Sequence, residues 1–180
     1  MSTLYQIRQY SREVTRDFIK APPTFHRSSD DEDLEITKEG LFIKGQPYDA
    51  LKIVNRIISE AEESIILIDG YIDSDTLDLL SEKKEDVTVK ILTYEIGASL
   101  VPLAQAWNRQ YGNLEIHTSK DMHDRFIIID ENDFYHFGYS IKDLGRKGFM
   151  FSRIEEEVIK RALFDEFNRI WDQDSEIVKI

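Results

Sequence analysis

The sequence predicts an α/β sandwich in which helices flank a mixed, mostly parallel central sheet. From residue 34 onward, short apolar runs of strand length alternate with segments whose apolar residues follow helical spacing. The run at 64–71, S-I-I-L-I-D-G-Y, is continuous and apolar until Asp-Gly closes it, which is typical of a central strand covered on both faces. Strands that alternate with helices favour parallel pairing, because each helix returns the chain across the sheet.

The elements are expected in the following order. Two short apolar segments, 34–36 and 41–43, flank Glu39-Gly40 and predict a hairpin-like pair. The spacing of apolar residues then predicts helices at 48–61, 74–83 and 98–111, and strands at 64–71, 87–93, 114–118, 125–130 and 134–138. A last helix carries one core face, formed by Ile159, Leu163, Phe167, Ile170 and Trp171.

Two regions are expected along the chain. Residues 1–33 form an N-terminal arm with a weak helical pattern, which ends at two prolines and is followed by an acidic, polar linker. Residues 34–180 form the domain. We find no internal repeat in it.

Composition limits the class of protein. The 180 residues include no cysteine, which excludes disulfides and cysteine-based zinc sites and favours a reducing, cytoplasmic setting. No apolar run is long enough to span a bilayer, so membrane insertion is not expected. The net charge of −12 argues against a generally basic nucleic-acid-binding surface, so any grip on a polyanion must depend on a few well-placed cations.

The most informative pattern lies at 123–130, where His123 is followed by one residue, Arg125, four further residues and then Asp130. Three of the four intervening residues are isoleucine, which predicts a short buried strand. His123 and Arg125 are two residues apart and therefore share a face of that strand. The offset of seven puts Asp130 on the opposite face, so we interpret it as a structural anchor.

This order, followed by the turn Gly138-Tyr139-Ser140, resembles the HxK(x4)D signature of the phospholipase D superfamily. It is also similar to single-motif phospholipase D-like domains of bacterial proteins. The resemblance implies a phospholipase D-like fold and a metal-independent, nuclease-like phosphodiesterase that acts through a phosphohistidine and needs no cofactor. In such chemistry one imidazole attacks the phosphodiester and a second protonates the leaving oxygen.

The resemblance also assigns roles to residues. The candidate catalytic residues are His123, Arg125 and Asp130, with His123 as the nucleophile or, in a partner subunit, as the acid. The candidate substrate-binding residues are Ser140, Lys142 and Tyr71. One of Glu155, Glu156 and Glu157 is a further candidate to orient His123.

The motif occurs once, so a site with two imidazoles needs two copies of the chain. We therefore expect a homodimer whose twofold axis passes through the site. The expected substrate is nucleic acid or another phosphodiester, rather than a phospholipid.

Departures from the family pattern keep other interpretations open. Arg125 stands where the family has lysine, seven residues rather than six separate Asp130 from Gly138, and the family's Asn after the serine is absent. A second interpretation is a catalytically weak or inactive module of the same fold that binds a phosphate-bearing ligand or a protein partner. A third is an unrelated α/β regulatory domain. A metal site is not expected, because the spacing of His117, His123 and His136 matches no zinc signature.

Overall fold

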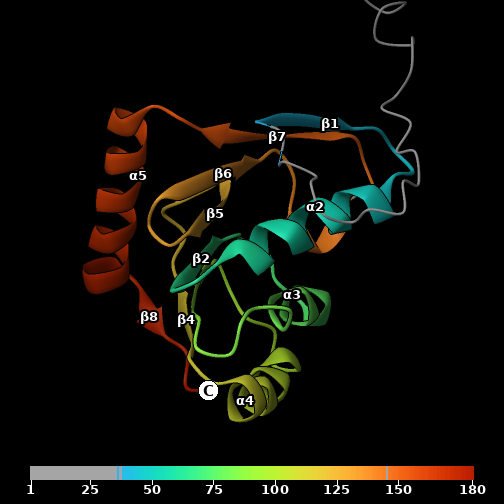
Figure 1. Cartoon of the computed structure of the whole chain (residues 1–180). Helices are drawn as coiled ribbons and strands as arrows, with labels where there is room; N and C mark the ends of the chain where they lie inside the picture. The colour runs from blue at the N-terminus through green and yellow to red at the C-terminus, as the bar shows by residue number, and fades with distance from the viewer. Residues whose placement is uncertain (1–35, 37, 145) are drawn as a thin grey trace, which may run out of the picture. The chain divides into compact units, whose positions relative to one another are not determined.

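The computed structural model describes residue 36 and residues 38–144 and 146–180, which form an α/β unit (Figure 1). Its strands are β1 (Glu39–Phe42), β2 (Ser64–Ile68), β3 (Thr88–Thr93), β4 (Leu114–Thr118), β5 (Arg125–Ile129), β6 (Asp133–Phe137), β7 (Phe149–Ile154) and β8 (Glu176–Ile177). Its α-helices are α2 (Pro47–Glu60), α3 (Ser74–Leu80), α4 (Leu100–Tyr111) and α5 (Glu157–Arg169). A 3-10 turn, η1 (Ile141–Asp143), and a π-helical turn, η2 (Ile170–Asp174), complete the list.

All eight strands belong to one sheet, in the order β1-β7-β6-β5-β2-β3-β4-β8. The α/β class is confirmed, but the expectation of a mostly parallel sheet is wrong. Only the pairs β2–β3 and β3–β4 are parallel, and the other five are antiparallel. No α-helix separates β4, β5, β6 and β7 along the chain, so short connections reverse its direction at each step.

The N-terminal expectations meet the described residues only in part. The predicted arm and linker, 1–33, lie outside them, as do residues 34 and 35 of the predicted hairpin. Glu39 and Gly40 lie inside β1, which pairs with β7, and not in a turn. A Cβ on Gly40 would lie 2.1 Å from Cε1 of Phe151, so the glycine leaves room for that ring to cover the strand.

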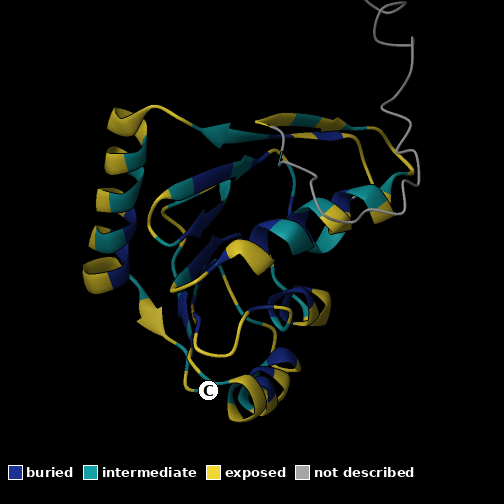
Figure 2. Cartoon of the chain, viewed as in Figure 1, coloured by how far each residue is buried: buried dark blue, intermediate teal, exposed yellow. Residues whose placement is uncertain are grey.

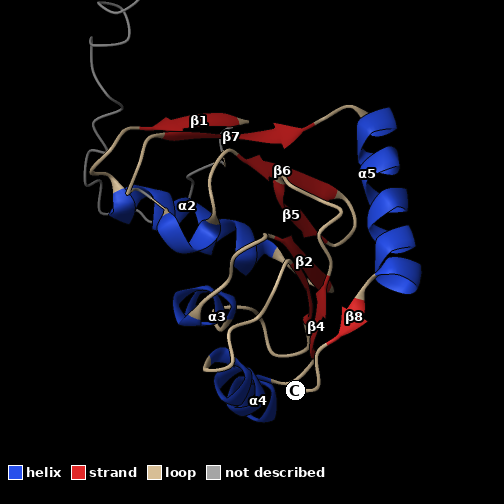
Figure 3. Ribbon diagram, turned by 180° about the vertical axis from the view of Figure 1, so that it is seen from behind, coloured by secondary structure: helices blue, strands red, loops and turns tan. Residues whose placement is uncertain are grey.

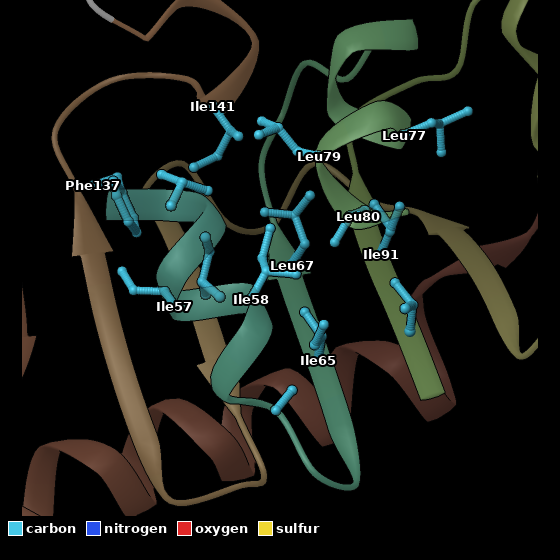
Figure 4. Close-up of a cluster of buried hydrophobic side chains, with 14 of the residues drawn as sticks. Ile57, Ile58, Ile65, Leu67, Leu77, Leu79, Leu80, Ile91, Phe137 and Ile141 are labelled. Carbon is cyan, nitrogen blue, oxygen red and sulfur yellow. The ribbon is translucent and has the colours of Figure 1, made fainter. Parts of the chain in front are cut away.

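Helices cover both faces of the sheet and create two cores. In Figures 1 and 3, α2, α3 and α4 lie on one face and α5 lies on the other. The alternation along β5 divides the strand between them: Ile127 and Ile129 enter the larger core under α2, α3 and α4, and Ile128 enters the smaller core under α5. Figure 4 shows the larger core, where side chains of α2 such as Ile57 and Ile58 face Ile65 and Leu67 of β2.

The last helix has the predicted core face, but only its C-terminal part is deeply buried. Phe167, Ile170 and Trp171 are buried, whereas Ile159 near the start is 53% exposed (Figure 2). The helix ends in the π-helical turn η2, which brings Trp171 onto the sheet. No helix in the described ranges combines the length and apolar character needed to cross a membrane.

We predict that Ile127→Ala lowers the free energy of unfolding by about 2–5 kcal/mol, because it leaves a cavity at a site that is only 2% exposed. Val158→Ala, at a position 80% exposed, is the control and should change stability by no more than about 0.5 kcal/mol. Urea denaturation measures both. Equal midpoints for the two variants would contradict the assignment of Ile127 to the core.

Candidate functional site at the His123 edge

His123 lies at the edge of the sheet where β2 and β3 end and β5 begins, which we call the His123 edge. Ile68 at the end of β2 pairs with Phe126 of β5 in antiparallel register. Residues that follow β2 therefore lie beside residues that precede β5. The carboxyl ends of parallel strands commonly present ligand-binding groups in α/β proteins, and β2 and β3 are a parallel pair.

The imidazole of His123 is exposed and held on one side. Its Nδ1 lies 2.5 Å from the hydroxyl oxygen of Tyr94, and the two rings meet edge to face with centroids 5.6 Å apart. Its Nε2 has no hydrogen-bond partner within the part of the chain that the structure describes. The orienting group is therefore Tyr94 and not one of Glu155, Glu156 and Glu157.

A row of aromatic rings connects His123 to a cation. The ring of Tyr71 meets that of Tyr94 edge to face, with centroids 5.5 Å apart. On Tyr71, Nζ of Lys142 lies 5.9 Å from the ring centroid, within the range of a cation–π contact. Tyr71 is 47% exposed, so this row borders solvent. The structure thus brings the predicted residues Lys142 and Tyr71 to the same edge as His123.

Arg125 is the second cation at this edge. It alternates with Ile127 and Ile129 along β5 and so lies on the face of the larger core. Its Nε is buried and has no hydrogen-bond partner among the described atoms, which is uncommon for a buried donor. Its positive charge lowers the pKa values of Asp69 and Tyr94, although burial has the larger, opposing effect on both. Arg125 therefore lies close to both groups.

Asp69, which follows β2, is fully buried and holds the turn that follows β6. Its carboxylate accepts hydrogen bonds from the Ile141 backbone N–H at 2.7 Å and from the Ser140 hydroxyl at 2.8 Å. A third comes from the backbone N–H of Tyr71 at 3.1 Å. Ser140 is 5% exposed, and its hydroxyl also lies 3.0 Å from the Tyr71 carbonyl oxygen. This geometry favours a structural use of the Ser140 hydroxyl over direct contact with a ligand.

Burial raises the pKa of Asp69 above its ordinary value of 3.8. The hydrogen bonds from Ile141, Tyr71 and Ser140 oppose the effect without cancelling it. A buried carboxylate with this many donors is typical of a group that fixes loop geometry.

Asp130 lies at the other end of β5 from His123. Its carboxylate oxygens accept three backbone hydrogen bonds, from Glu62 at 2.9 Å and from Glu63 and Ser64 at 2.8 Å each. Its φ of 50° lies in the left-handed region that Asp tolerates better than most residues. Asp130 thus joins the β5–β6 turn to the start of β2, in keeping with the anchor interpretation. It does not contact His123.

The other two histidines of the described domain lie on the face of the sheet that α5 covers. His117 on β4 stacks on Trp171 with ring centroids 3.7 Å apart, and its Nδ1 lies 2.6 Å from the Ser175 hydroxyl. His136 on β6 packs against Phe126 in register. Within residues 38–144 and 146–180, no three His, Asp or Glu side chains are grouped so that they could hold a metal ion.

The sequence did not identify Tyr94, or the contact of its ring with Gly70, as part of the site. A Cβ on Gly70 would lie 2.7 Å from Cε2 of the Tyr94 ring, so the ring rests against this glycine. Tyr94 directly follows β3 at the edge where Tyr71 follows β2. That position was the one available signal, because the edge of a parallel strand pair is where ligand groups gather.

Comparison with known proteins identifies the fold of the chain. No family model matches the chain, and no curated protein matches it. Solved structures do match, and they show that the chain has the fold of the phospholipase D superfamily, as the motif predicted.

Nuc from Salmonella typhimurium, a phospholipase D family member, is 18% identical with a TM-score of 0.60, and the match covers 79% of this chain and 99% of Nuc. NucT from Helicobacter pylori is 15% identical with a TM-score of 0.58, again over 79% and 99%. TrmBL2, an archaeal chromatin protein with a novel mode of DNA binding, is 18% identical with a TM-score of 0.54. That match covers 97% of this chain but 65% of TrmBL2.

We predict that Asp130→Asn lowers the free energy of unfolding by about 1–2 kcal/mol at pH 7, because an amide offers one acceptor oxygen where the carboxylate offers two. Burial alone would raise the pKa of Asp130, but its backbone hydrogen bonds hold it below the ordinary 3.8. Its stabilising effect is therefore present above that pH and is lost as the pH falls through the lowered, folded-state pKa.

Urea denaturation of both proteins at pH 7 and at about pH 3 tests this prediction. The difference between wild type and Asp130→Asn should narrow at the lower pH. A difference that stays constant would mean that the charge of Asp130 does not stabilise the fold.

Proposed function

We propose that this chain is a metal-independent phosphodiesterase of the phospholipase D type, with nuclease-like chemistry, that acts through His123 at a site shared by two copies of the chain. One observation carries the proposal. Among the described residues, the exposed His123 imidazole is held through Nδ1 and has no partner at Nε2, and the buried Nε of Arg125, two residues later, has none either. The phospholipase D fold, shared with Nuc and NucT, supports it.

The chemistry needs two imidazoles and fixed positive charge. Nε2 of one imidazole attacks phosphorus, so that an N–P bond forms while the bond from phosphorus to the leaving oxygen breaks. The second imidazole gives that oxygen a proton. Water then attacks the phosphohistidine, releases the phosphate monoester and restores the free imidazole. In this proposal Arg125 and Lys142 stabilise the charge on phosphorus-bound oxygens, which their position at the His123 edge supports.

The Arg125 side chain is suited to bind a phosphate group. A buried N–H without an acceptor costs about 1–3 kcal/mol, a cost that a phosphate oxygen would relieve. A guanidinium can also bind phosphate through two parallel hydrogen bonds. The nearby carboxylate of Asp69 is already occupied by three donors, so it leaves the guanidinium available to a ligand.

The second imidazole would come from another copy of the chain. His117 stacks on Trp171 and His136 packs against Phe126, both on the face of the sheet that α5 covers. Neither is hydrogen-bonded to His123 among the described residues. A self-complementary interface with its twofold axis at the site would bring two His123 side chains together.

Nucleic acid and small phosphodiesters are the substrate classes that we propose. The net charge of −12 leaves little general attraction for a polyanion, so the local cations must provide it. DNA binding by TrmBL2, 65% of which matches this fold, supports nucleic acid as one of these classes.

A second candidate function is a module that binds a phosphate-bearing ligand or a protein partner without turnover. The bonds of Ser140 favour it, because its hydroxyl is directed to Asp69 and is not free to contact a phosphate. The replacement of lysine by Arg125 also favours binding over turnover, because a guanidinium is larger and its charge is spread more widely.

We predict that wild type is a dimer that hydrolyses bis-p-nitrophenyl phosphate and single-stranded DNA in the presence of EDTA. His123→Ala should lower the rate by on the order of 10³-fold, because the nucleophile is lost. His136→Ala is the matched control and should leave it unchanged. Sedimentation equilibrium gives the oligomeric state. A monomer, or a rate unaffected by His123→Ala, would refute the shared-site phosphodiesterase.

Arg125→Lys separates the two candidate functions. In an enzyme slowed by its arginine, lysine restores a compact charge at phosphorus, and we expect kcat to rise roughly tenfold, equivalent to about 1.4 kcal/mol. In a binding module the variant stays inactive and keeps affinity for phosphate. No rise in rate from a measurable wild-type activity would show that Arg125 does not limit turnover.

A further inference from the structure

The hydrogen bond between Tyr94 and His123 has a direction that matters for the chemistry of the imidazole. A neutral imidazole donates through one ring nitrogen and accepts through the other. If the phenol donates to Nδ1, the ring proton lies on Nε2. If Nδ1–H donates to the phenol oxygen, Nε2 keeps a lone pair. The first form is a hydrogen-bond donor toward a ligand and the second is a nucleophile.

The partners of the Tyr94 hydroxyl favour the phenol as the donor. In the described domain, His123 Nδ1 is the single hydrogen-bond partner of that hydroxyl, so a phenol that accepted from Nδ1 would have no protein acceptor for its own proton. A phenol is also the stronger acid of the two neutral groups, and the separation of 2.5 Å is at the short end for a hydroxyl donor.

Nε2 then carries a proton in both charge states of the ring. When Nδ1 takes up a second proton, the phenol turns from donor to acceptor, and Nε2–H is unaffected. We propose that Tyr94 is a positioning residue that keeps resting His123 protonated at Nε2, as a hydrogen-bond donor to an anionic oxygen of a phosphate group. The proposal rests on the second candidate function, phosphate binding without turnover, because a protonated Nε2 has no lone pair to attack phosphorus. The phosphodiesterase requires the other tautomer, with the proton on Nδ1.

The packing around the Tyr94 ring suits a positioning role. The ring is confined by Gly70, where a Cβ would come within 2.7 Å, and by the ring of Tyr71. The backbone N–H of Tyr94 donates to the carbonyl oxygen of Gly70 at 3.3 Å. A carboxylate in place of this phenol would accept from Nδ1–H and free the Nε2 lone pair, so the identity of residue 94 decides which form of the imidazole faces the ligand.

The tautomer can be observed directly. We would label the histidines of the full chain with ¹⁵N, assign His123 with His123→Ala, and record the ring nitrogen shifts under conditions in which the ring is neutral. Wild type should show the Nε2–H tautomer. Tyr94→Phe, which keeps the ring and removes the hydroxyl, should give a mixture of tautomers. Tyr111→Phe, at the far end of α4, is the control and should match wild type.

Binding of inorganic phosphate tests whether the fixed Nε2–H donor contributes to affinity. Titration should shift the His123 Nε2 signal, and Tyr94→Phe should weaken the apparent affinity about tenfold, because the donor is no longer fixed. Gly70→Ala keeps the hydroxyl but displaces the ring, and it should give the same loss. An Nδ1–H tautomer in wild type, or the same tautomer and affinity in Tyr94→Phe, would overturn the proposal. Absence of hydrolysis would refute the phosphodiesterase and leave these readings intact.

Discussion

The buried carboxylate of Asp69 holds together the segments on which the His123 edge depends. It joins the end of β2 to the turn after β6 through Ser140 and Ile141, residues about seventy positions later in the chain. Tyr71 follows it on one side, and Lys142 extends from the turn that it holds. The row of rings between Lys142 and His123 therefore depends on a group that touches neither. A buried, ionisable side chain is costly, and here its donors offset much of that cost.

Two carboxylates fix the segments at the two ends of β5. Asp130 lies at one end, where three backbone donors lower its pKa, and Asp69 lies beside the other, where burial raises it. Between them, Ile127 and Ile129 fill the larger core and Ile128 the smaller one. The strand is thus fixed at both ends and on both faces. Such a rigid support suits a site whose geometry depends on a single exposed imidazole.

Much of the fold could be predicted from the sequence, because the spacing of apolar residues reflects which side chains are buried. The strand expected at 114–118 has those bounds, and the helix expected at 98–111 begins two residues later at Leu100. Strand direction was not accessible in this way, because parallel and antiparallel strands in a buried sheet have similar patterns. Strands β7 and β8 were missed. Strand β7 follows a turn whose sequence does not show where the next element begins. Strand β8 has only two residues, and both are exposed.

The site was predictable where it follows strand geometry and not where it depends on contacts. The two-residue spacing of His123 and Arg125, and the distance of Asp130 from them, follow from the alternation of a strand. That Ser140 bonds to Asp69, and that Tyr94 meets His123, could not be read from spacing, because these partners lie on different segments. The structure shows where all six candidate residues lie, but their roles in catalysis and binding stay predictions.

The order of the strands also bears on how the chain folds. The segment from β2 to β4 makes parallel pairs between strands close in sequence, with α3 and α4 between them, and can form early. By contrast, among the described strands β1 pairs only with β7, and its Glu39 lies opposite Ser152, more than a hundred residues later. Closing such a long loop is slow because its entropy must be lost before the contact forms. We therefore expect the β1 edge of the sheet to be completed last, after the His123 edge has taken its shape.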